Sequence, residues 1–103
     1  MSGAERYEDL CDDLIARHPG IERAKMMGMA SVKRDGKLVA GFVAAEDAMA
    51  FKLTDPDAHA QALALVGAHL FDPSGKGRPF KEWVVVPPAH AARWLELAHA
   101  ALM

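Results

Sequence analysis

The chain has 103 residues, of which 51% are apolar and 25% are charged, and its formal net charge at pH 7 is −2. These values are typical of one soluble globular domain spanning residues 1–103, and no apolar run approaches the ~18 residues of a membrane span. The single cysteine excludes an internal disulfide. A single cysteine is typical of a protein in a reducing compartment. The acidic N-terminus is unlike a secretory leader, and together these features favour a cytoplasmic protein.

The N-terminal residues predict an amphipathic helix that begins after Ser2. Ser2 and Glu5 have the spacing of a capping box, and Pro19-Gly20 is expected to end the helix. Five residues form one apolar stripe at helical spacing: Tyr7, Leu10, Cys11, Leu14 and Ile15. Because Cys11 lies on this stripe beside two aspartates, we expect a buried core thiol and no catalytic role.

Residues 23–54 predict three strands. Asp35-Gly36 is a strong hairpin signal. Residues 38–44 are almost wholly apolar, as in a central strand, and residues 48–53 alternate in hydropathy. In the first of the three strands the apolar positions change face near Gly28. This change predicts a bulge or a tight bend at that glycine.

The second half predicts two more strands between two helices. Asp55-Pro56 is expected to cap a helix that ends at Gly67. Short strands follow at residues 69–71 and 82–87, and Pro87-Pro88 precedes a last amphipathic helix. The predicted order, α-β-β-β-α-β-β-α, indicates an α+β two-layer sandwich with an antiparallel sheet of about five strands.

Three segments in this order carry a family resemblance: "KMMGMASVKRDGKLVAGF", "MAFKL" and "GKGRPFKEWVVVP". Together they resemble the N-terminal domain of the TfoX/Sxy family, named for regulators of bacterial competence, over roughly residues 20–103. Met27 stands where the family usually has an aromatic residue. Regulatory members carry a second, C-terminal helical domain, and the likeness here is to the N-terminal domain alone. The resemblance implies a non-catalytic module that binds a protein partner or itself.

The stretch from Gly75 to Lys81 is the first candidate binding segment. It lacks the full P-loop pattern, and a proline and a strand follow it where a P-loop opens a helix. Its glycines can expose backbone N–H groups as an anion-holding concavity, with a rim formed by Lys76, Arg78 and Lys81. The alternative is a solvated connection between strands, with Trp83 anchored in the core.

The methionine cluster is the second candidate. Met26, Met27 and Met29 follow one another closely, and methionine suits adaptable binding surfaces. The alternative is that they fill gaps under a helix. If they are exposed, Met27 and Met29 are the residues expected to bind a partner or to form a homodimer.

Two function classes therefore stay open. The first is the interaction module, and the second is weak, salt-dependent binding of nucleic acid or another anion through the 75–81 loop and the basic hairpin that precedes and follows Asp35-Gly36. The acidic first helix argues against broad nucleic-acid affinity. The histidines lack ligand-like spacing, and no acid–base or nucleophile pattern is evident. We therefore expect no metal, no cofactor and no enzymatic activity.

Overall fold

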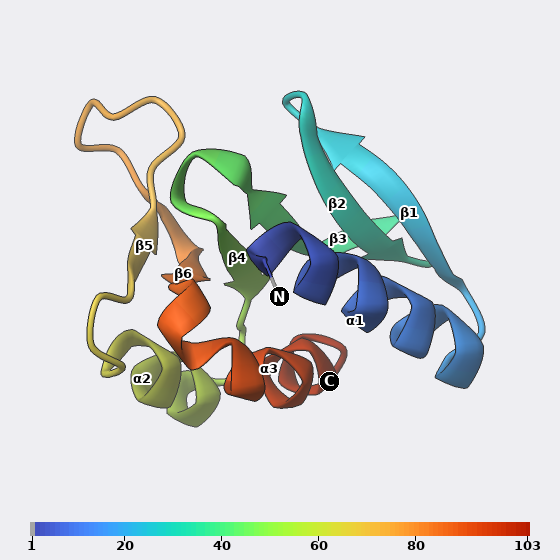
Figure 1. Ribbon diagram of the computed structural model, residues 1–103. Coiled ribbons are helices and arrows are strands. Elements are labelled where there is room, and N and C mark those ends of the chain that lie inside the picture. Colours follow the sequence, from blue (N-terminus) through green and yellow to red (C-terminus); the bar gives the residue numbers. More distant parts are fainter. Residues whose placement is uncertain (1) are drawn as a thin grey trace.

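The computed structural model describes residues 2–103. In chain order its elements are α1 (Gly3–Arg17), β1 (Ile21–Met26), β2 (Met29–Arg34), β3 (Lys37–Val43), η1 (Ala44–Glu46), β4 (Ala48–Lys52), α2 (Pro56–Leu63), β5 (His69–Phe71), β6 (Phe80–Val86), η2 (Pro88–Arg93) and α3 (Trp94–Ala101). One antiparallel sheet has the strand order β1-β2-β3-β4-β6-β5, and the α-helices lie on one side of it (Figure 1). The predicted α+β sandwich is confirmed, with six strands in place of about five.

The β1–β2 turn explains the extra strand. Met27 and Gly28 form a two-residue turn, because Met26 pairs with Met29 on the two sides of it. Both turn residues have positive φ, 51° for Met27 and 79° for Gly28, as a type I′ hairpin requires. The chain therefore reverses where the sequence predicted a bulge or bend within one strand. The change of apolar face that the sequence predicted near Gly28 is therefore the place where the chain reverses direction.

The N-terminus of α1 is held by two carboxylates. The predicted capping box is present, since the Ser2 hydroxyl accepts from the Glu5 N–H and the Glu5 carboxylate accepts from the Ser2 N–H. A second carboxylate comes from the turn before β4, where Asp47 accepts a 2.9 Å hydrogen bond from the Gly3 N–H. A Cβ at Gly3 would lie 2.3 Å from the Asp47 carbonyl oxygen. Glycine is therefore required for this close approach.

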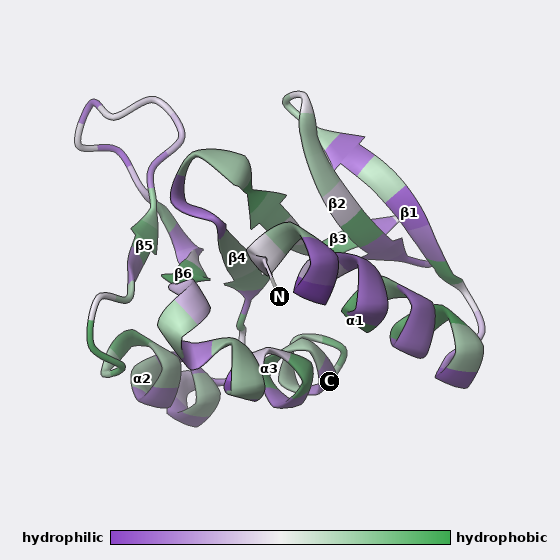
Figure 2. Ribbon diagram, in the orientation of Figure 1, coloured by the Kyte–Doolittle hydropathy of each residue, from purple (hydrophilic) through white to green (hydrophobic). Residues whose placement is uncertain are grey.

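The main core lies between the sheet and the helices. Val32, Ala40, Phe51 and Val84 are in register across four strands and are fully buried. Trp94 at the start of α3 packs into the same cluster, and its indole N–H donates to the Val86 carbonyl oxygen at 3.2 Å. Figure 2 shows the apolar central strands β3 and β4 behind α1, whose outward turns are largely polar.

Two helix predictions need correction. Ile15 was expected on the buried stripe of α1, but its side chain is 42% exposed. The other four stripe residues, Cys11 among them, are buried as predicted. The second predicted helix ends at Leu63 rather than at Gly67, and the residues between them form turns that leave Val66 85% exposed.

The sheet face opposite the helices, which we call the open face, carries a second apolar cluster. This cluster contains only strand residues: Ala48, Ala50, Phe71, Trp83 and Val85, with Met26, Met29, Leu38 and Val43 packed against them. Trp83 is 7% exposed, so the expected anchoring of this tryptophan in apolar surroundings is confirmed. The Met29 methyl group lies where a side chain at Gly41 would begin, at 2.5 Å from an ideal Cβ. The open face thus covers its centre with its own long side chains.

Gly28→Val should lower the free energy of unfolding by about 1–3 kcal/mol, because a β-branched residue is strained at positive φ. Urea denaturation of the purified protein measures the change. Met27→Asn is the matched control at the neighbouring position, since asparagine tolerates positive φ. An unchanged midpoint for Gly28→Val would contradict the turn.

Gly3→Ala should also destabilise the protein by about 1–3 kcal/mol, although alanine is the better helix former. The added methyl group has to displace the carbonyl oxygen of Asp47. Thermal unfolding compares it with Asp9→Ala on the exposed side of α1, which should change stability by less than about 0.5 kcal/mol. Equal stability of both variants would show that α1 does not depend on this approach.

Candidate functional site

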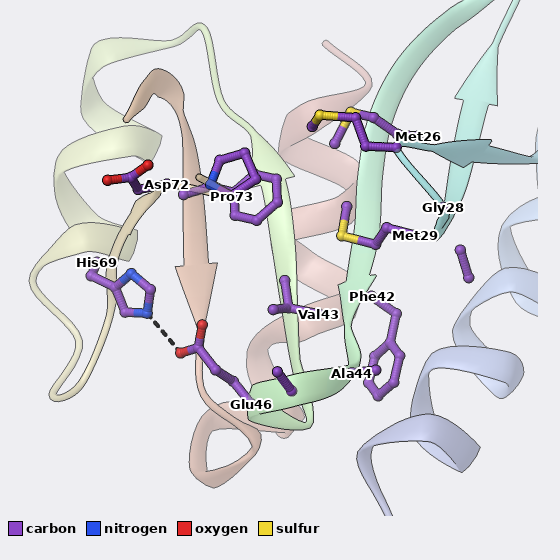
Figure 3. Close-up of a pocket in the computed structure, with 14 residues that line it drawn as sticks. Met26, Gly28, Met29, Phe42, Val43, Ala44, Glu46, His69, Asp72 and Pro73 are labelled. Carbon is purple, nitrogen blue, oxygen red and sulfur yellow. Dashed lines mark hydrogen bonds and ion pairs between the residues drawn. The ribbon is translucent and has the colours of Figure 1, made fainter. Parts of the chain in front are cut away.

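A cavity of about 520 Å³ opens on the open face and is the best-formed candidate site. Three segments enclose it: the β1–β2 turn, the η1 turn and the end of β5 (Figure 3). Its lining includes Met26, Met29 and Val43 from the first three strands, and Phe71 and Pro73 from β5 and the segment after it. The volume lies within the range of small-molecule sites and the lining is mostly apolar. We call this cavity the open-face pocket.

The three methionines have different positions in the open-face pocket. Met26 and Met29 are half-buried, and Figure 3 shows both beside the cavity. Met27 also lines the cavity, but it lies at the tip of the turn and is 65% exposed. Met29 fills a gap over Gly41, but it does so on the face opposite the helices, whereas one alternative expected it to fill a gap under a helix. Met27 offers exposed apolar surface, as the other alternative expected.

One ion pair closes the end of the pocket next to η1. His69 Nε2 lies 2.7 Å from Glu46 Oε1, shown by the dashed line in Figure 3, and His69 Nδ1 lies 2.9 Å from the Leu70 carbonyl oxygen. Since both ring nitrogens face acceptors, the doubly protonated ring satisfies both contacts. The Glu46 carboxylate, and then the Leu70 carbonyl, raise the pKa of His69 against a smaller effect of desolvation. The pair ties β5 to η1.

The glycine-rich loop does form the concavity of N–H groups that the sequence predicted. The anion inside it is the chain's own Asp72. Its carboxylate accepts from the Gly77 N–H at 2.9 Å, from the Gly75 N–H at 3.1 Å and from the Ser74 hydroxyl at 3.0 Å. These donors are therefore not free for an external anion.

The cations of the loop are solvent-exposed. Lys76, Arg78 and Lys81 are all exposed. None of them is in an ion pair within residues 2–103, and none lines the open-face pocket. The structure brings Met27 and Met29 together at one cavity, and it leaves these three cations outside it. Anion binding by the three side chains stays a prediction.

Sequence reasoning did not identify four residues that shape the pocket: Glu46, His69, Phe71 and Pro73. Glu46 and His69 are 23 residues apart, and only the pairing of β3, β4, β6 and β5 brings them together. The sequence signal was the acidic pair Glu46-Asp47 in an otherwise apolar stretch, which gives no indication of the partner of Glu46.

The thiol of Cys11 is held inside the fold. Cys11 is fully buried, and burial raises the pKa of its thiol.

Within residues 2–103, no group of three or more histidine, cysteine, aspartate or glutamate side chains is arranged to hold a metal ion. No helix in the described part of the chain is both long enough and apolar enough to cross a membrane.

Comparisons of the chain with protein-family models, with curated proteins and with solved structures found no match. The resemblance to the TfoX/Sxy N-terminal domain therefore rests on the sequence segments alone.

The Asp72 carboxylate should titrate below its ordinary pKa of 3.8. Desolvation raises this pKa, but the hydrogen bonds from Ser74, Gly77 and Gly75 together outweigh it. Loop stabilisation by Asp72 is thus present above the unfolded pKa and is lost as the pH falls through the lower folded pKa. Amide proton shifts of Gly75 and Gly77, followed by NMR against pH, should share one midpoint below 3.8. Separate midpoints, or one at a higher pH, would show that the carboxylate does not hold the loop.

Proposed function

We propose that the protein is a non-catalytic interaction module, and that the open-face pocket with Met27 binds a second copy of the chain. This is the function class that the TfoX/Sxy resemblance implies. The pocket supports it because its lining is mostly apolar and its polar groups already have partners within the chain. Such a surface is recognised by apolar contact rather than by charge.

The observation that carries the proposal is Met27 itself. The turn at Asp35-Gly36 has nearly the same φ values, 51° and 82°, and uses the residue pair that such turns prefer. At the β1–β2 turn a bulky methionine occupies the equivalent position at 51° and is 65% exposed. A bulky apolar residue is uncommon at positive φ and gains nothing from solvent exposure. A role in binding explains why the chain has methionine there.

The position of Met27 suits pairing between identical molecules. A two-fold interface uses the same patch on both subunits, so a protruding group and the cavity that receives it must lie side by side. Met27 lines the open-face pocket and also projects from its rim. A two-fold axis beside the rim can place each Met27 in the pocket of the other copy. The ion pair of Glu46 with His69 neutralises two of the three charged side chains of the lining, and the third, Asp72, accepts hydrogen bonds from its own loop.

Edge-to-edge pairing of β1 is a less favourable route to the same dimer. β1 is an edge strand, and a two-fold axis normal to the sheet pairs residues that lie on the same face. Centring the pair on Arg23 opposes two arginines, each of them ion-paired with Glu8 and Asp12, and centring it on Ala24 opposes Arg23 with Lys25. Charged residues on an edge strand oppose such pairing. The open face is therefore the better self-binding surface.

Sedimentation equilibrium from micromolar to millimolar concentration tests the proposal. The parent chain should approach twice the monomer mass, and Met27→Asn should stay monomeric while keeping the turn, because asparagine suits positive φ. Val66→Ser removes another exposed apolar side chain, after α2, and should dimerise like the parent. A monomeric parent, or a dimer that survives Met27→Asn, would contradict this use of the pocket.

A further inference from the structure

A second cavity, of about 480 Å³, lies at the other end of strands β2, β3 and β4. It forms where the β2–β3 turn meets the end of β4 and the residues that follow α3. Its charged lining comes from three strands: Arg34 ends β2, Lys37 begins β3 and Lys52 ends β4, with Asp35 in the turn. We call this cavity the cationic pocket.

The cations of this pocket have no acidic partner within residues 2–103, because none of the ion pairs there involves Arg34, Lys37 or Lys52. The Arg34 guanidinium donates through Nη1 to the Leu102 carbonyl oxygen across 3.4 Å, a long contact that uses one of its five N–H groups. By contrast, the guanidinium of Arg23 binds the carboxylates of Glu8 at 2.6 Å and Asp12 at 3.0 Å. Arg34 is positioned by a backbone carbonyl and keeps its charge available.

The charge balance of the pocket matches a doubly charged anion. The charged side chains of the lining, three cations and one aspartate, carry a net charge of about +2, and a phosphate monoester carries about −1.5 to −2 near pH 7. Arginine offers a planar fork for phosphate oxygens and lysine a point charge. The remaining wall is mostly apolar, with the hydroxyl-bearing Thr54 beside five apolar residues: Leu38, Val39, Ala101, Leu102 and Met103.

We infer that the cationic pocket is a binding site for a small phosphate monoester, with the phosphate on Arg34, Lys37 and Lys52 and the organic group against the apolar wall. The glycine-rich loop carries the same number of cations, but its N–H groups already hold Asp72. Arg34 and Lys52 are half-buried at a cavity with an apolar side and only Lys37 is exposed, whereas all three loop cations are exposed. This site is separate from the open-face pocket and does not depend on the proposed self-association.

Two triple variants form a matched test, since each removes three positive charges. Phenyl phosphate and inorganic phosphate are titrated into the protein at low salt, and amide shifts are followed by NMR. Arg34→Ala/Lys37→Ala/Lys52→Ala should weaken phenyl phosphate binding about tenfold or more. Lys76→Ala/Arg78→Ala/Lys81→Ala should bind like the parent. Phenyl phosphate should bind more tightly than inorganic phosphate because of the apolar wall.

Asp35→Asn is expected to tighten binding, and a gain of affinity cannot result from misfolding. Asp35 has φ 51°, where asparagine is well tolerated, and the substitution removes the acid from the lining. Binding of phenyl phosphate should become roughly twofold to fivefold tighter.

Three results would overturn the inference. One is that the parent shows no binding. Another is that the loop variant loses as much affinity as the pocket variant. The third is that Asp35→Asn binds no better than the parent.

Discussion

The packing of the helices onto a single face of the sheet is the interaction on which the rest of the structure depends. Phe51 in the middle of β4 and Trp94 at the start of α3 are both buried in this layer, and each large apolar side chain removed from water contributes on the order of 2 kcal/mol or more. Residues 2–103 contain three α-helices, and all of them contribute to the main cluster. The open face of the sheet has no α-helix packed on it, so the side chains of its own strands have to shield its apolar centre from water.

The open-face pocket follows from that requirement. Trp83 and Phe71 cover one part of the open face and Met29 covers Gly41, but side chains from separate strands do not close the surface completely. The cavity remains where the β1–β2 turn, η1 and the end of β5 converge. Asp47, next to η1, also holds the N-terminus of α1. The same turn thus borders the pocket and fixes the first helix of the other layer.

The two groups of cations show how tertiary structure changes the meaning of a charge pattern. The loop between β5 and β6 has the composition of an anion-binding segment, yet Asp72 at its start accepts the hydrogen bonds that its backbone offers. Arg34 and Lys37 look like an ordinary basic hairpin, yet Lys52 joins them at one cavity. In the loop the deciding residue is Asp72, and in the cationic pocket it is Lys52. The local sequence pattern does not predict the position that either side chain takes in the fold.

The sequence by itself determined the features that adjacent residues control. The Ser2 capping box, the Asp35-Gly36 turn and the Asp55 cap were predicted because a few neighbouring atoms decide each of them. The β1–β2 turn was missed as a reversal, since methionine is not a turn residue and only the pairing of Met26 with Met29 reveals it. Both cavities were decided by the tertiary structure alone. Each cavity is lined by segments that are separated in sequence, and the strand order and the packing of the core make these segments neighbours.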